Sequence, residues 1–120
     1  MTRRRRIYIA GPLSTGDRKA NVQYACQVGV ELMRAGYAPL VPHLSDYMDP
    51  DDSLGYEAWL QVCLAWVGAA DALLRMPGLS KGADEEAKLA DSLGLPVYRS
   101  TRALFEGLSP VVHTAPVLRW

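Results

Sequence analysis

The sequence lacks a net charge, a long apolar run and a cysteine pattern, and each absence excludes a class of protein. Thirteen Lys and Arg balance thirteen Asp and Glu in 120 residues, so no net charge draws the chain to nucleic acid or to an anionic membrane. No apolar run approaches the roughly 20 residues that span a bilayer. Cys26 and Cys63 have neither metal-ligand spacing nor a disulfide framework. We therefore predict a cytoplasmic protein in a reducing compartment, with no metal site and no membrane or nucleic-acid partner.

Two nucleotide-binding motifs are also absent. The sequence contains neither a GxGxxG dinucleotide fingerprint nor a P-loop, which disfavours a nicotinamide enzyme and a standard NTPase. The one local excess of charge is the run Arg3–Arg6. Such a run can tether phosphate or nucleic acid, but no aromatic residues interleave with it, which favours a solvated flank before a buried strand. The apolar stretch that follows is too short for a signal peptide and ends at Gly11-Pro12.

Short apolar segments alternate with segments of helical periodicity. The expected strands are Ile7–Ala10, Pro39–Pro42 (short or at an edge), Ala70–Leu74 and Pro96–Tyr98. The expected helices are Asp17–Ala35, Tyr56–Ala69, Ala83–Leu93 and Thr101–Leu108. This alternation predicts one α/β domain over residues 1–120, a small Rossmann-like or flavodoxin-like three-layer sandwich with a mainly parallel sheet of four to five strands.

Three other segments complete this prediction. Residues 1–6 are expected as a basic flank, and residues 109–120 as a C-terminal tail without a clear period. Val117, Leu118 and Trp120 predict that the tail docks, on the domain or on a neighbouring subunit. Residues 43–55 are polar and form the longest expected loop, which is typical of a functional lid or a disordered segment.

One carboxylate stands out on the third predicted helix. Asp84 and Glu85 have lysines three or four residues away, which places both on the surface. Glu86 instead has Gly82, Ala83, Leu89 and Ala90 at those spacings, so it faces inward. An inward carboxylate costs several kcal/mol unless it is hydrogen-bonded, which makes it a candidate functional group. Proximity to a helix N-terminus favours its ionised form. A structural role, in which Glu86 caps the loop or pairs with an arginine such as Arg75, stays open at this point.

Other candidates are individually weaker. The turn from Gly11 to Gly16, with Ser14, and the segment Ser80-Lys81-Gly82 each precede a helix and offer backbone N–H groups to a phosphate. Each is also compatible with an ordinary turn. His43 follows the second strand and is a candidate acid or base, although a lone loop histidine is more often structural. The sequence favours a solvated loop for the acids Asp46, Asp49, Asp51 and Asp52, and core positions for Trp59 and Trp66.

Three segments occur in one order and spacing and together carry a resemblance. They are IYIAGPLSTG, WLQVCLAWVGAADALLRMPG and SKGADEEAKLADSLGLPVY. The chain resembles the nucleoside 2-deoxyribosyltransferase superfamily, which includes the 2'-deoxynucleoside 5'-phosphate N-hydrolases, from about Ile7 to Tyr98. In that family the catalytic glutamate lies between a glycine and an alanine four residues to either side. Gly82, Glu86 and Ala90 match this pattern, so the resemblance selects the residue that the helix face selects.

The resemblance implies a mechanism and a set of site residues. Glu86 would attack C1' of a deoxyribose and form a glycosyl-enzyme ester, which water or a second base then releases. Tyr8 would orient the glutamate, and Asp71, which matches an acid at the start of the third strand, would be a third catalytic residue. Gly11 and Pro12 would form the floor of the pocket, while Ser80 and Gly82 match positions that approach the 5'-phosphate. No cofactor is implied, and a homodimer or higher homo-oligomer is expected.

One departure from the family pattern affects the expected activity. Relatives commonly carry an aspartate eight residues before the Asp71 position, and this acid is tied to protonating the leaving base. Cys63 stands there in this sequence, and a thiol with an ordinary pKa near 8.5 does not do the same work. Either His43 or a loop aspartate substitutes, or the leaving group needs little help, or the chain is a non-catalytic nucleotide-binding protein. Hydrolysis and base transfer are not distinguished by the sequence.

Overall fold

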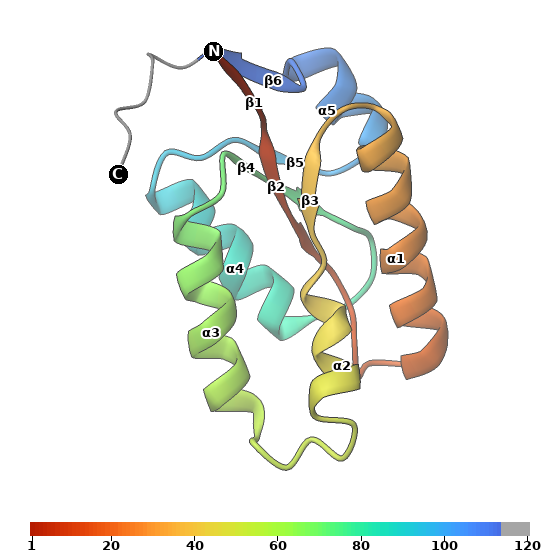
Figure 1. Ribbon diagram of the computed structural model, residues 1–120. Coiled ribbons are helices and arrows are strands. Elements are labelled where there is room, and N and C mark those ends of the chain that lie inside the picture. Colours follow the sequence, from red (N-terminus) through yellow and green to blue (C-terminus); the bar gives the residue numbers. More distant parts are fainter. Residues whose placement is uncertain (114–120) are drawn as a thin grey trace.

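The computed structural model describes residues 1–113, which fold around a parallel sheet (Figure 1). The strand order is β3-β2-β4-β5, with the bounds Ala38–Leu40, Arg6–Ala10, Ala72–Arg75 and Val97–Tyr98. Neighbouring strands pair in parallel throughout this sheet. The predicted α/β class and the predicted parallel sheet are therefore confirmed, and the short proline-containing strand β3 lies at an edge as expected.

Four helices cover the sheet on both faces and make three layers (Figure 1). Their bounds are Arg18–Arg34 for α1, Tyr56–Gly68 for α3, Lys81–Ser92 for α4 and Thr101–Gly107 for α5. Successive side chains of a strand point to opposite faces, so β2 serves two cores. Ile7 and Ile9 pack with residues of α1 and α5, whereas Tyr8 and Ala10 pack with residues of α3 and α4. None of the helices within residues 1–113 is long and apolar enough to cross a membrane.

Helix α4 begins two residues before its predicted start. The Ser80 hydroxyl accepts a hydrogen bond from the Ala83 N–H at 3.1 Å and caps the helix there. The helix therefore includes Lys81 and Gly82 in its first turn. Glu86 falls in the second turn, beyond the reach of most of the helix dipole.

The segment after β3 is more ordered than predicted. A 3-10 turn over Pro42–Leu44 and the short helix α2 over Ser45–Met48 occupy the first half of the expected loop, so the prediction of a loop is wrong for residues 43–48. Pro42 stands at the first helical position, where its fixed φ favours a helical start. Asp46 of α2 forms an ion pair with Arg18 of α1 at 2.6 Å, which holds α2 against the main domain.

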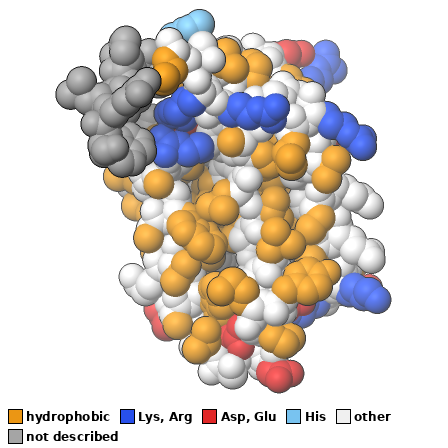
Figure 2. Space-filling model, viewed as in Figure 1, with side chains coloured by type: hydrophobic (Ala, Val, Ile, Leu, Met, Phe, Trp, Pro, Cys, Tyr) orange, Lys and Arg blue, Asp and Glu red, His pale blue; other side chains and the backbone are white. Residues whose placement is uncertain are grey.

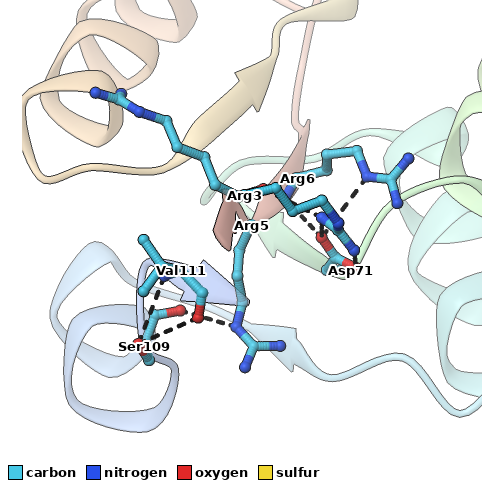
Figure 3. A network of polar contacts seen from close by, with 7 residues as sticks. Arg3, Arg5, Arg6, Asp71, Ser109 and Val111 are labelled. Carbon is cyan, nitrogen blue, oxygen red and sulfur yellow. Dashed lines mark hydrogen bonds and ion pairs between the residues drawn. The ribbon is translucent and has the colours of Figure 1, made fainter. Parts of the chain in front are cut away.

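The arginine run is only in part a solvated flank. Thr2–Arg4 forms strand β1, which pairs antiparallel with strand β6 over Val111–His113. Figure 3 shows Arg3 and Arg6 directed toward Asp71, while Arg5 lies toward Ser109. The run thus joins the two ends of the described chain. The docking predicted from Val117, Leu118 and Trp120 lies outside the described residues.

Candidate functional site

A cavity of about 230 Å³ lies at the carboxyl ends of β2 and β3, between α3 and α4. The β2 strand and the turn after it contribute Tyr8, Gly11 and Ser14, and the segment after β3 contributes His43. Helices α3 and α4 contribute Cys63, Glu86, Gly82 and the capping residue Ser80. The structure therefore brings most of the predicted site residues together. This location agrees with the general rule that parallel sheets bind ligands at the carboxyl ends of their strands.

Glu86 is the buried carboxylate of this cavity. Only 7% of its surface is exposed, and the hydroxyl of the fully buried Tyr8 donates a hydrogen bond to its Oε2. Burial raises the pKa of the Glu86 carboxyl to about 7, although the Tyr8 hydrogen bond and the charge of Arg75 act in the opposite direction. Burial also raises the pKa of Tyr8 far above its ordinary value, so its hydroxyl stays neutral and remains a donor. The prediction that the helix N-terminus favours the ionised form is therefore outweighed by burial.

Arg75 does not form an ion pair with Glu86. Its guanidinium instead binds Asp84 Oδ1, with Nη2 at 2.9 Å and Nε at 3.3 Å, and Nη2 also donates to the Gly78 carbonyl at 2.9 Å. Asp84 lies on the exposed side of α4, as its spacing predicts. The alternative structural role, in which Arg75 neutralises Glu86, is thus not adopted. The contact that holds Glu86 is the one from Tyr8.

Cys63 lies beside the Tyr8–Glu86 pair, at the position where the resemblance predicts an aspartate. Its thiol is close enough to the Tyr8 hydroxyl to form a hydrogen bond. Burial raises the pKa of the Cys63 thiol above its ordinary value, and the nearby Glu86 charge adds to the shift. The thiol therefore keeps its proton at neutral pH and is a poor acid.

His43 presents an unpaired nitrogen in the cavity wall. The residue is only 3% exposed, and its Nε2 lies 3.2 Å from the Gly11 carbonyl oxygen. A carbonyl only accepts, so this contact places the proton on Nε2 and leaves Nδ1 as an acceptor. Within the described residues Nδ1 has no hydrogen-bond partner. Burial lowers the pKa of His43, which keeps the ring neutral.

The sequence did not predict the part of the wall that Asp49 organises. Asp49 is 5% exposed rather than solvated, and it accepts hydrogen bonds from the Leu54 N–H at 3.0 Å and the Trp59 Nε1 at 2.9 Å. The backbone N–H and hydroxyl of Ser53 donate to its other oxygen. These donors hold the pKa of Asp49 well below its ordinary value. Trp59 consequently lines the cavity, and its predicted position in the core is wrong. No spacing rule links Asp49 to Trp59, because the turn between them creates the contact.

Two predicted site residues lie elsewhere. Asp71 precedes β4, at the opposite end of that strand from the cavity, and it is not among the cavity residues. Its carboxylate accepts from Arg3 at 2.6 and 2.9 Å and from the Arg6 N–H at 2.8 Å. Pro12 packs against Gly78, where an added Cβ would lie 2.7 Å from the proline ring, and it is not among the residues that line the cavity. Within residues 1–113, no group of three or more His, Cys, Asp or Glu is placed to hold a metal ion.

The fold is similar to that of a solved enzyme. A 2-deoxyribosyltransferase from the psychrotolerant bacterium Bacillus psychrosaccharolyticus superposes with a TM-score of 0.56 at 24% identity. The match covers 77% of this chain and 69% of that chain. At this identity the similarity shows a shared fold, and it agrees with the three-layer α/β architecture.

Sequence comparison places the chain in a family without assigning an activity. None of the curated proteins matches it. Residues 5–100 match the family model described as a domain of unknown function, DUF7768. This range contains the strands and the helices that build the cavity. The chain therefore belongs to the DUF7768 family.

Proposed function

We propose that this protein cleaves or transfers the N-glycosidic bond of a nucleoside, a deoxynucleoside or the corresponding 5'-monophosphate, with Glu86 as the nucleophile. The observation that carries the proposal is a buried carboxylate that accepts a hydrogen bond from Tyr8, in a cavity at the carboxyl ends of parallel strands. The fold shared with a 2-deoxyribosyltransferase supports the same reaction class.

The proposed reaction is a double displacement at the anomeric carbon. Glu86, when ionised, attacks C1' and forms a glycosyl ester while the base departs, as nucleophilic carboxylates do in retaining glycosidases. The neutral Tyr8 hydroxyl orients the attacking carboxylate through its hydrogen bond. Water then releases the sugar in a hydrolase, and a second base accepts it in a transferase. We propose that hydrolysis and base transfer would use the same site and the same glycosyl ester.

The rim of the cavity is suited to a 5'-phosphate. Ser80 and Gly82 stand at the start of α4, and the backbone N–H groups of a helix N-terminus favour an anion. Ser14 lies in the facing turn, and Lys81 adds a positive charge to the same rim. This arrangement supports a nucleotide substrate. A homodimer or higher oligomer remains a prediction from the family resemblance.

A second candidate function is non-catalytic nucleotide binding. The observation that favours it is Cys63, whose protonated thiol stands beside Tyr8 and Glu86 where the family pattern has an acid. A protein of this kind would retain the cavity and bind nucleotides without releasing base.

The experiment that separates these functions follows base release from purified protein. Deoxynucleosides, ribonucleosides and their 5'-monophosphates are incubated with and without a second base, and free base is separated by chromatography. Glu86→Gln runs in parallel, with Asp91→Asn as the matched control because Asp91 is an exposed acid on the same helix. Release by the parent and by Asp91→Asn, but not by Glu86→Gln, is the expected result. No release from any substrate, combined with saturable nucleotide binding, would support the binding protein instead.

A further inference from the structure

The groups that line the cavity offer no suitable acid to a departing base. A neutral base leaves as an anion unless a positioned acid protonates it. The Cys63 thiol is a weak proton donor, because burial raises its pKa. His43 is neutral, and its one N–H is committed to the Gly11 carbonyl. Asp49 is an ionised carboxylate, because its hydrogen-bond donors hold its pKa low.

The remaining titratable groups of the wall do not fill this role. The Tyr8 hydroxyl is committed to Glu86, and Glu86 must itself lose its proton in order to attack. The pKa of Tyr56 is raised, first by burial and then by the nearby carboxylates Glu85 and Glu57. Asp52 and Lys81 lie on the exposed rim. The described part of the chain therefore provides a nucleophile and no acid to pair with it.

The buried charges of the wall are carboxylates, whereas the lining cations Arg18 and Lys81 are half-exposed and exposed. Asp49, Asp52 and Glu86 all line the cavity. Arg18 also lines it, but its guanidinium is neutralised by Asp46 at 2.6 Å and lies 3.9 Å from Asp52. Figure 2 shows acidic side chains at the lower end of the molecule, with basic side chains beside them at the right, where Figure 1 places the loop between α2 and α3. The buried charges of the cavity wall are thus acidic, although the composition of the whole chain is neutral.

Aromatic side chains complete this environment. Trp59 and Tyr56 both line the cavity, and Asp49 holds the Trp59 ring through its indole N–H. The faces of such rings attract cations, including N-alkylated and quaternary ones, through their negative π-electron density. Carboxylates and aromatic rings around one cavity are the usual combination for recognising a delocalised cation.

The geometry points to N-glycosides with a cationic leaving base, such as an N-alkylated purine or a pyridinium nucleoside, as the substrate class of this site. This inference rests on the proposed function. A Glu86 oxygen forms the bond to the anomeric carbon while the carbon–nitrogen bond breaks. The electron pair of that bond moves to the base nitrogen and cancels its positive charge, so the base leaves neutral and needs no proton. Water then displaces the ester oxygen, Glu86 is regenerated as a carboxylate, and one proton passes to solvent.

The experiment compares matched substrates that differ by one charge-fixing methyl group. The pairs are 7-methylguanosine with guanosine and 7-methyl-2'-deoxyguanosine with 2'-deoxyguanosine, each also as the 5'-monophosphate, and nicotinamide mononucleotide is a pyridinium probe. Each Glu86-dependent kcat/KM is divided by the uncatalysed rate of the same substrate, since cationic bases leave faster even in water. A positioned acid contributes on the order of 10²- to 10⁴-fold, so we expect the acceleration to be about 100-fold greater for the cationic member of each pair.

Two variants of one residue locate the cause. Cys63→Asp restores a carboxyl group beside the reacting centre, and we expect it to raise the acceleration of the neutral substrates by about 100-fold and so narrow the preference. Cys63→Ser has a similar size but no acid with a suitable pKa, and we expect it to retain the preference. Thermal melting verifies that each variant is folded, and the substrate pairs on the parent protein give the result even when Cys63→Asp does not fold.

The outcomes separate this inference from the function on which it rests. Equal or greater acceleration of the neutral substrates by the parent overturns the inference and leaves the proposed glycosidic chemistry in place. No Glu86-dependent release from any member of either set overturns both. A preference that Cys63→Ser abolishes as fully as Cys63→Asp also overturns the inference, because the missing acid would then not be its cause.

Discussion

Asp71 and Glu86 are two acids at opposite ends of the same sheet, and the structure treats them in opposite ways. Asp71 has a side chain that is 17% exposed, and it accepts hydrogen bonds from Arg3 and from the Arg6 backbone (Figure 3). Those donors lower its pKa to about 2. Glu86 is 7% exposed, receives a hydrogen bond from one neutral tyrosine, and has its pKa raised to about 7.

The comparison shows how the surroundings of two acids shift their pKa values in opposite directions. Asp71 stabilises the fold, because its contacts with Arg3 and Arg6 favour the ionised carboxylate more than burial disfavours it. Glu86 has too few donors to compensate for its burial, so its ionised form is destabilised in the folded protein. Such uncompensated burial in a cavity is typical of functional sites. The resemblance alone grouped both residues as catalytic, and the surroundings distinguish them.

The largest expected effect is on base release by Glu86→Gln. The amide has the same shape but no nucleophilic oxygen anion, so we expect kcat/KM to fall on the order of 10⁴-fold. Chromatographic quantification of free base measures it. Residual activity within tenfold of the parent would show that another group attacks the sugar.

The second effect concerns stability and its dependence on pH. The folded pKa of Glu86 is raised above its ordinary value of 4.5, so the folded state binds the extra proton between pH 4.5 and about 7. The contribution of Glu86 to the free energy of unfolding is therefore fully present below pH 4.5 and is lost as the pH rises through about 7. We expect Glu86→Gln to exceed the parent by about 3 kcal/mol in unfolding free energy above that range and to match it below. Urea titrations at about pH 5 and about pH 8 test the sign, and a gain that does not change with pH would contradict the assignment.

The third effect isolates the contact from Tyr8. Tyr8→Phe preserves the buried ring but removes the donor, which raises the pKa of Glu86 further because the ionised form loses its hydrogen bond. A hydrogen bond to a charged group contributes about 1.5–3 kcal/mol, so base release near neutral pH should fall roughly 10- to 100-fold. The activity profile should also move to higher pH. A fall without that movement would indicate a packing role for Tyr8.

The smallest effect belongs to Asp71. Its lowered pKa gives stability that is present above its ordinary value of 3.8 and is lost as the pH falls through about 2. Arg3 has a side chain that is 35% exposed, so solvent screens the pair, and Asp71→Asn should cost about 1 kcal/mol near neutral pH. Chemical denaturation with Asp91→Asn as the exposed control measures the loss. Base release by Asp71→Asn that is as weak as that of Glu86→Gln would return Asp71 to the catalytic set.

The sequence predicted the features that depend on near neighbours in the chain. Alternation of apolar runs and helical periods predicted the parallel α/β fold, and spacings of three and four residues placed Glu86 on the inward face of its helix. Its failures have two causes. The start of α4 was missed although the Ser80 cap is a local contact to Ala83, three residues away. The ordering of part of the expected loop could not be predicted from spacing, because the ion pair of Arg18 and Asp46 joins residues far apart in the chain.

The sequence by itself thus determined the fold class and the inward position of Glu86, because apolar alternation and helical spacing depend on residues close together in the chain. The expectation of an acid at the Cys63 position came from the family resemblance. Only the tertiary structure decided which charges are compensated. In the folded protein Arg3 binds Asp71, Arg75 binds Asp84, and Tyr8 donates a hydrogen bond to Glu86. These pairs join residues far apart in the chain or on separate elements. A carboxylate's pKa depends on the donors and the solvent that the completed fold leaves around it.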